Sequence, residues 1–326
     1  MGQKIFALLF LLLFSSASYS ELVIRVTQGN DKPTRIAIAP IDQTGIQTGE
    51  DISRIVEADL QRSGLFETIE RRDMLAFPGR AQDVYYRDWR LLGTEYLVAG
   101  QLRSVGGGRY QLEFSLLNVP AQKTELTHKV SGTMTQLRDL AHLVSDKVYQ
   151  EITGIRGTFS TRLAYVTAIR KNNKYTYRLN VADADGAREK LVLESGEPIM
   201  SPSWSGNGKE LAYVSFETGR PAIFRQNLVT AERQQLTNFT GLNGAPSWSP
   251  DGTQMALVLS KDGNPEIYLL DLQSNKFSRM TRHFAIDTEP TWMPDGKSLL
   301  FTSDRGGTPQ IYKLNIATKA TERLTF

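Results

Sequence analysis

Apolar and polar residues alternate through the second half of the chain in a pattern that returns every 44 residues. Each unit has a short stretch that ends at a tryptophan, a tight turn, and then three alternating stretches separated by polar turns. In the best-preserved unit these three stretches are 254–260, 266–272 and 276–281. Alternation with a period of two predicts β-strands. Four antiparallel strands per unit, with a repeat length in the forties, are typical of the blades of a β-propeller.

Trp204, Trp248 and Trp292 occupy the same position in three successive units. Such residues could stack against a sugar or a base, or they could pack between neighbouring blades. We favour packing, because a ligand would not require one tryptophan in every repeat, whereas a four-stranded sheet leaves one face for its neighbour to cover. The turn Ser-Pro-Asp-Gly at 249–252 places glycine where a left-handed backbone is needed.

A degenerate earlier copy at 163–195 brings the number of units to four, over residues 158–326. Closed propellers have four to eight blades and join the first blade to the last. The sequence ends at residue 326, where the next inner strand would begin. We therefore expect an incomplete ring and a truncated sequence.

The first half of the chain has no repeat and predicts a mixed α+β domain over residues 21–157. Runs of β-branched and alternating residues predict strands at 21–29, 34–41, 96–102 and 109–119. Apolar stripes with helical spacing predict helices at 51–60 and 135–152. We expect Thr135 to cap the second helix, and Gly64 and Gly154 to end the two helices.

The N-terminus predicts export. Lys4 precedes ten apolar residues at 5–14, and small residues follow at Ser18 and Ser20. Ten apolar residues are too few to cross a bilayer, so we interpret residues 1–20 as a signal peptide that is cleaved between Ser20 and Glu21. The chain has no cysteine, which excludes disulfides, thiolate metal sites and a lipid-modified cysteine.

Few residues suggest a catalytic, phosphate-binding or metal-binding site. Three glycines at 106–108 could form a phosphate loop, but a helix should then follow, and a strand follows instead; we predict a hairpin turn. His128 and His142 each stand alone in the sequence, without a second ligand at metal-binding spacing, so we predict no metal site and no cofactor. The net charge of +3 is not concentrated, which argues against nucleic acid as a partner.

The chain resembles the TolB family, periplasmic components of the Tol–Pal system of Gram-negative bacteria. The residues that carry the resemblance are the signal peptide and the segments 21–29, 51–73, 89–102, 149–166, 243–260 and 288–316. The resemblance implies a six-bladed propeller, of which about two blades are missing here. It also implies a non-enzymatic adaptor that maintains the outer membrane and its invagination during cell division, and that group A colicins exploit for import.

The resemblance further implies two binding segments. The lipoprotein Pal is expected at the mouth of the propeller, where the loops before the inner strands converge, and the residues that match by position are Met200, Leu242, Asn243, Gly244, Ala245, Thr288 and Glu289. Leu242 stands where the family leads us to expect histidine. TolA is expected to bind the mature N-terminal segment, made of Glu21, Leu22, Val23, Ile24, Arg25, Val26 and Thr27. Other periplasmic or outer-membrane proteins stay open as partners.

Two other classes of function stay open as alternatives. A propeller-bearing hydrolase needs a G-x-S-x-G nucleophile elbow with triad partners, and the 326 residues contain no such motif and only His283 within the repeats. A glycan-binding propeller would use exposed aromatic residues, which the packing interpretation of the tryptophans disfavours.

Overall fold

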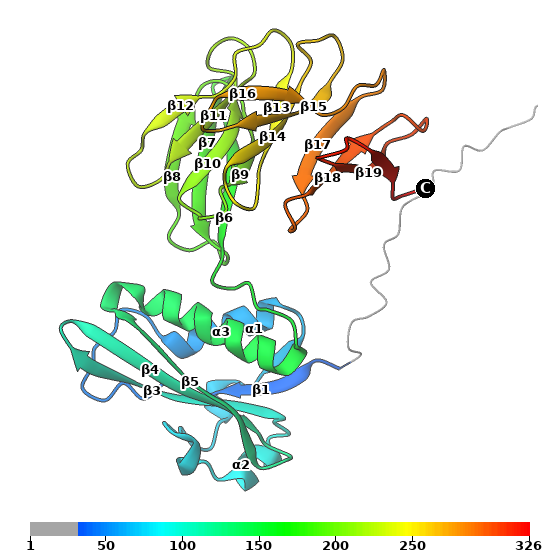
Figure 1. Ribbon diagram of the computed structural model, residues 1–326. Helices are drawn as coiled ribbons and strands as arrows, with labels where there is room; N and C mark the ends of the chain where they lie inside the picture. The colour runs from blue at the N-terminus through cyan, green and yellow to red at the C-terminus, as the bar shows by residue number, and fades with distance from the viewer. Residues whose placement is uncertain (1–31) are drawn as a thin grey trace, which may run out of the picture. The chain divides into compact units, whose positions relative to one another are not determined.

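The computed structural model describes residues 32–326, which form two compact units. The first unit ends at Lys129, and the second covers Val130–Phe326 (Figure 1). The predicted signal peptide, the predicted strand at 21–29 and the proposed TolA-binding segment lie outside the described residues. Within residues 32–326, no helix has both the length and the apolar character needed to cross a membrane.

The first unit is built on a five-stranded sheet with the strand order β2-β1-β3-β4-β5. β1 pairs in parallel with β2 and β3, whereas β3 and β4 are antiparallel. The strands are β1 (Thr34–Ile38), β2 (Phe66–Thr68), β3 (Tyr96–Gly106), β4 (Arg109–Asn118) and β5 (Lys123–Thr133), the last of which crosses into the second unit. The predicted strands at 34–41, 96–102 and 109–119 are thus confirmed.

Helix α1 (Ile52–Arg62) confirms the first helix prediction. Its N-cap is Asp51, whose carboxylate accepts a hydrogen bond from the Arg54 N–H at 3.3 Å. The predicted apolar stripe is buried, and Gly64 follows the helix with a left-handed φ of 73°. The unit also contains α2 (Tyr86–Leu91) and the 3₁₀ turns η1 (Arg71–Asp73) and η2 (Ala81–Asp83).

The triple glycine forms the turn between β3 and β4. Gly106, Gly107 and Gly108 all have positive φ, and nothing lies within 4 Å of the position where a Cβ would be. The hairpin prediction is therefore confirmed, and glycine is needed here for its backbone freedom rather than for space.

The second unit begins with helix α3 (Leu137–Thr153), which follows the 3₁₀ turn η3 (Met134–Gln136). The prediction that Thr135 caps this helix is wrong. The N-cap of α3 is Gln136, which makes no side-chain capping hydrogen bond. Thr133 caps the preceding turn η3, and its N–H donates a hydrogen bond to the Gln136 side-chain oxygen at 3.0 Å in a reciprocal capping box. The helix ends as predicted at Gly154, which has a left-handed φ of 73°.

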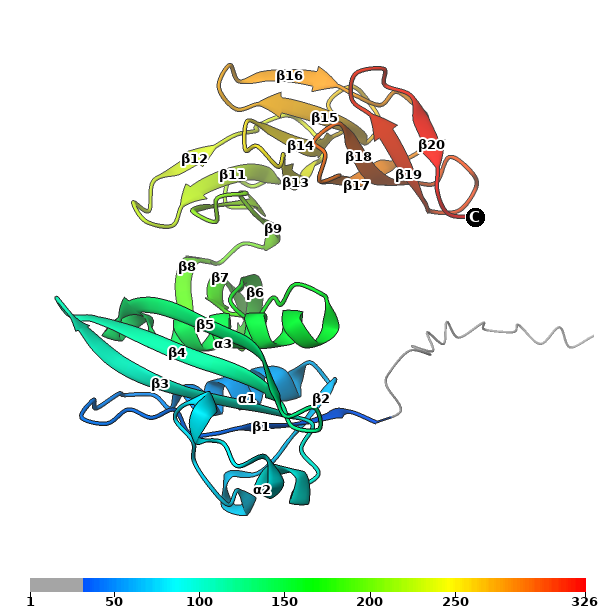
Figure 2. The same ribbon diagram turned by 60° about the horizontal axis from the view of Figure 1, so that its bottom comes forward.

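Four antiparallel sheets follow α3 and confirm the expected blades (Figures 1 and 2). The first sheet has three strands, and each of the other three has four. The first lacks an inner strand because residues 155–161, which precede it, form turns and irregular backbone. The strands are β6 (Arg162–Lys171), β7 (Lys174–Asp183) and β8 (Lys190–Ser195); β9 (Ile199–Trp204), β10 (Glu210–Ser215), β11 (Ala222–Asn227) and β12 (Arg233–Gln235); β13 (Asn243–Trp248), β14 (Gln254–Leu259), β15 (Glu266–Asp271) and β16 (Lys276–Arg279); and β17 (Asp287–Trp292), β18 (Ser298–Ser303), β19 (Gln310–Asn315) and β20 (Thr321–Arg323).

The tryptophans join neighbouring blades, as predicted. The Trp248 indole N–H donates to the Ser203 carbonyl at 3.3 Å, and the Trp292 indole N–H donates to the Ser247 carbonyl at 3.0 Å. Both acceptors lie on the inner strand of the preceding blade. Trp248 also belongs to an apolar cluster with Ala212 and other residues of that blade. Each indole thus combines apolar burial with one polar contact across the blade interface.

The turn at 249–252 has the predicted chemistry. Asp251 accepts hydrogen bonds from the Ser249 hydroxyl at 2.6 Å and from the Thr253 N–H at 3.0 Å, and Gly252 has a φ of 73°. These hydrogen bonds fix the connection between β13 and β14.

Candidate functional site

The three inner strands β9, β13 and β17 share an irregularity at one repeat position. Ser201, Ala245 and Glu289 have positive φ values of 50°, 48° and 52°. In each blade the pairing with the second strand shifts register at this point. A left-handed backbone costs a residue with a side chain about 1–3 kcal/mol and persists only where the surroundings impose it. Because it recurs in three blades, the bulge is part of the repeat.

The bulges lie beside a pocket of about 150 Å³. All seven residues predicted for the mouth line it: Met200, Leu242, Asn243, Gly244, Ala245, Thr288 and Glu289. The remaining lining residues are Ser201, Val214, Phe216, Pro221 and Val258. The structure therefore brings together at one place residues that come from three blades and are almost ninety positions apart in the sequence.

The pocket has a buried apolar floor and an exposed apolar rim. Val258 is completely buried and Val214 is 4% exposed. Met200 and Leu242, in contrast, are 53% and 40% exposed. Exposed apolar side chains around a concave surface are a common sign of a binding site.

Hydrogen bonds made by Leu242 and by the next residue, Asn243, hold the loop that carries Leu242 in place. The fully buried Asn243 donates its side-chain amide to the carbonyls of Phe239, at 2.8 Å, and Gly241, at 3.1 Å. The Leu242 N–H donates to the Ser260 hydroxyl at 2.7 Å. A Cβ at Gly241 would lie 2.3 Å from that hydroxyl oxygen, so only glycine fits here. The loop is thus preorganised, which lowers the entropy cost of binding.

The next blade has an ionic version of the same arrangement. Asp287 takes the place of Asn243, is fully buried, and accepts hydrogen bonds from Arg305 at 2.9 and 2.7 Å. The Ile286 N–H donates to the Asp304 carboxylate at 2.8 Å, as the Leu242 N–H does to Ser260. Two different sets of side chains therefore fix equivalent loops.

Two exposed apolar residues near the mouth were not predicted as site residues. Phe284 is 87% exposed and Ile286 is 51% exposed, and both lie in the loop that leads into β17. Ile286 stands 44 residues after Leu242, so the repeat itself carried a signal for it. Neither lines the pocket, so we place them beside the site rather than in it.

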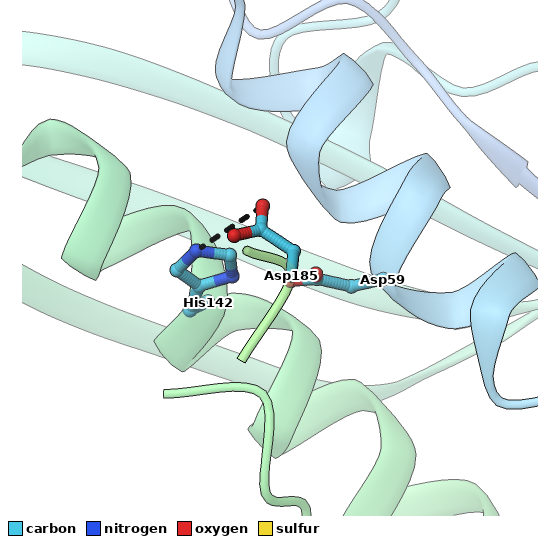
Figure 3. A group of neighbouring side chains, drawn as sticks. All are labelled: Asp59, His142 and Asp185. Atoms are coloured by element: carbon cyan, nitrogen blue, oxygen red, sulfur yellow. Dashed lines mark ion pairs between the residues drawn. The ribbon is translucent and has the colours of Figure 1, made fainter. Parts of the chain in front are cut away.

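His142 is buried on α3, beside two carboxylates. Its Nε2 is 3.9 Å from a carboxylate oxygen of Asp185 (Figure 3). The same atom is 4.0 Å from a carboxylate oxygen of Asp183. The sequence places no ligand at metal-binding spacing from His142, and the fold brings two carboxylates to it, from the end of β7 and the connection after it, more than forty residues away.

These carboxylates also bind arginines. Arg138 pairs with both Asp183 and Asp185, and Arg188 donates to Asp183 at 2.7 Å. Burial by itself raises the pKa of Asp185, but the Ala187 N–H and the positive charge of Arg138 outweigh it and lower the pKa. Arginines thus neutralise both carboxylates, and the ion pairs of Arg138 on α3 with Asp183 and Asp185 link this helix to the first blade. His128, the other histidine considered, is half-buried and packs edge-on against Phe114.

The fold and the site define a protein in which an α+β domain precedes β-propeller blades with a small apolar pocket at their inner strands. Two sequence families match this division: the TolB amino-terminal domain over residues 22–125, and the TolB beta propeller domain over residues 149–326. The chain belongs to the TolB family.

Individual relatives agree with this assignment. The chain is 52% identical to the Tol-Pal system protein TolB of Marinomonas sp. over 75% of this chain and 57% of the relative. For the protein of the same name from Pseudomonas syringae pv. syringae the identity is 49%, over 73% and 56%. The crystal structure of TolB from Acinetobacter baumannii superposes with a TM-score of 0.81 at 42% identity, covering 91% of this chain and 72% of that one.

The chain thus spans a little over half the length of the curated relatives that it matches. The names of those relatives describe a component of the Tol–Pal system and no catalytic activity, in agreement with the prediction that the chain is not an enzyme.

Proposed function

We propose that this chain is a periplasmic adaptor of the Tol–Pal system and that it binds the lipoprotein Pal through the pocket at the inner strands. The observation that supports this proposal most is that the seven residues carried over from the family line one preorganised pocket with an exposed apolar rim. Apolar residues at the centre of an interface supply most of its binding energy, and a fixed loop loses little entropy on binding.

A second contact completes the adaptor. We propose that residues 21–27 become the free N-terminus after cleavage of the signal peptide at Ser20 and bind TolA. A segment of alternating β-branched residues at a free end can add as a strand to the sheet edge of another protein, where main-chain hydrogen bonds provide affinity. In this proposal, residues 21–157 form the domain that carries this segment and residues 158–326 form the part that binds Pal.

With one partner at each membrane, such an adaptor would link the outer membrane to the inner one. This would account for a role in outer-membrane integrity and in invagination during cell division. Colicins that use the same binding surfaces would gain entry, which is the basis of the proposed role in bacteriocin import.

Pull-down of Pal with the mature chain, residues 21–326, tests the first contact. We compare wild type with Leu242→Asp at the rim and with Val229→Asp as a matched control. Val229 is 80% exposed and lies in the turn after β11, at the opposite end of its sheet. We expect wild type and V229D to retain Pal, and L242D to lose it, because a carboxylate would have to be desolvated against an apolar surface. Failure of wild type to retain Pal, while a complete TolB retains it, would contradict the proposal.

The TolA contact is tested separately. A chain that begins at residue 28 should retain Pal but lose TolA, whereas a synthetic peptide of residues 21–27 should compete for TolA. Retention of TolA by the shortened chain would overturn this part of the proposal and leave the Pal contact untouched.

A further inference from the structure

The pocket at the inner strands has the size of a single side chain. Its volume is about 150 Å³. A cavity of roughly 150 Å³ with apolar walls accommodates benzene, so this volume suits one apolar side chain up to about the size of a phenylalanine ring.

The walls also define the polarity of an occupant. Val214 and Val258 close the floor, and Phe216, Pro221 and Leu242 provide further apolar surface. Among the twelve residues that line the pocket, Glu289 is the single charged one, and it is exposed. An apolar floor beside a rim carboxylate suits an apolar side chain that is followed or preceded by a cation.

From this arrangement we propose that the partner inserts one apolar side chain, of leucine, isoleucine, methionine or phenylalanine size, into the pocket and places a lysine or arginine beside Glu289. The inference rests on the proposed function and adds to it the chemistry that selects the partner segment. The apolar side chain provides the binding energy, whereas the exposed charge pair contributes mainly to the association rate and to specificity.

Gly244 is a position at which the space in the pocket can be reduced. It lines the pocket on β13, and a Cβ there would meet only the Leu242 Cδ1 atom, at an ordinary contact distance of 3.8 Å. Its φ is not in the left-handed range, unlike that of Gly241. A side chain at this position is therefore free of backbone strain and extends into the open space that the inserted side chain would occupy.

Substitutions at Gly244 test the inference directly. We measure the affinity for the soluble domain of Pal by isothermal titration calorimetry with the mature chain, its Gly244→Ala and Gly244→Leu variants, and Gly49→Leu as control. Gly49 is an exposed glycine of the first unit, has nothing within 4 Å of its Cβ position and is also outside the left-handed range. We expect G244A to weaken binding several-fold and G244L by more than about tenfold, a change of about 1.4 kcal/mol, while G49L binds as wild type does.

Alanine substitutions in Pal, tested against both wild type and G244L, then identify the inserted side chain. An alanine scan of the Pal surface should reveal one apolar residue whose truncation weakens binding to wild type strongly but binding to G244L only slightly, because the two changes act on the same space. Reversal of the rim charge by Glu289→Lys should lower the association rate and weaken its dependence on salt.

The outcomes separate the two levels of the proposal. If wild type binds Pal and G244L, with an unchanged melting temperature, binds equally well, the single-side-chain inference is wrong and the proposed function stands. If wild type does not bind Pal, the proposed function fails and the inference with it. Should G244L fold poorly, G244A provides the same comparison with a smaller change.

Discussion

The two units of this protein bury tryptophan in different ways. In the first unit Trp89 is 1% exposed and fills a core to which strands β1, β3 and β4 contribute. In the second unit Trp248 and Trp292 are copies of one another, and each binds the blade before it. A core that occurs once shows only which residues are buried. A repeated core also shows which positions are common to all copies and which differ.

The blades differ from one another in the side chains at the mouth. The bulge with a left-handed residue is common to three blades. The buried residue at the start of the inner strand changes from Ile199 to Asn243 to Asp287, with no partner group in common. The backbone bulge is therefore repeated, whereas the side chain at the start of the inner strand differs from blade to blade. We regard this as the arrangement expected where a repeated scaffold carries one specific binding site.

The largest expected effect concerns the repeated tryptophan. Trp248→Ala should cost about 3–5 kcal/mol, because it leaves a cavity between two blades and removes the hydrogen bond to Ser203. Trp89→Ala should cost a similar amount in the first unit. Chemical denaturation followed by domain-specific fluorescence checks both.

The two tryptophan variants should differ in cooperativity. Since blades interact mainly with their neighbours, W248A should broaden the transition of the second unit by uncoupling the blades before and after it. W89A should shift the transition of the first unit without broadening it. Equal broadening in both variants would mean that the blades do not behave as separate elements.

A smaller effect is expected from Asn243→Ala. Removal of this buried amide leaves the carbonyls of Phe239 and Gly241 without their donor and should cost about 1–3 kcal/mol. The loop with Leu242 should also lose its fixed position, so Pal affinity should fall even at temperatures where the chain is folded. Asp51→Ala, which removes the cap of α1 in the first unit, should cost about 1 kcal/mol and leave Pal affinity unchanged.

The smallest effect is a difference in response to pH. In the second unit, the hydrogen bond from the Ser249 hydroxyl, with those from Thr253, lowers the pKa of Asp251 below its usual value. A lowered folded-state pKa stabilises the protein above the unfolded-state value of about 3.9, and this stabilisation is lost as the pH falls further. In the first unit, burial raises the pKa of Glu57, so its contribution is unfavourable at neutral pH and disappears on acidification.

The two carboxylates can be separated by substitution. Asp251→Asn should lower the melting temperature at pH 7 and have little effect near pH 2.5. Glu57→Gln should raise the melting temperature at pH 7 and have little effect near pH 3. Thermal unfolding between pH 2.5 and 7 measures both, and parallel pH profiles for the two variants would contradict the opposite signs.

Much of the fold could be predicted from the sequence because its signals are local or periodic. The blades and the packing of Trp248 followed from the 44-residue period, and the end of α3 followed from Gly154. β2 and α2 were not predicted, since three and six residues are too few for a periodic signal. The prediction of a cap at Thr135 was wrong because Thr133 and Thr135 are chemically equal candidates, and the backbone path places the capping box at Thr133, before η3 rather than at the start of α3.

The site was less accessible to sequence reasoning. The seven residues of the mouth came from family resemblance. The 44-residue period places Met200, Gly244 and Thr288 at equivalent positions of successive blades, but it does not by itself show that they line one pocket. The left-handed backbone at Ser201 and Ala245 has no sequence marker either, since neither residue favours it. The acidic neighbours of His142 come from a tertiary contact between α3 and the connection after β7.

The central claim is that the mouth of the repeats is the surface that binds Pal. Its most direct test is photo-crosslinking with a benzophenone amino acid placed at Thr288, which lines the pocket, or at Thr230, which is exposed in the turn at the other end of a blade. With the mature chain and Pal at equal concentrations, we expect a covalent adduct from position 288 and none from position 230. An adduct from position 230 alone, under conditions in which Pal is bound, would contradict the account.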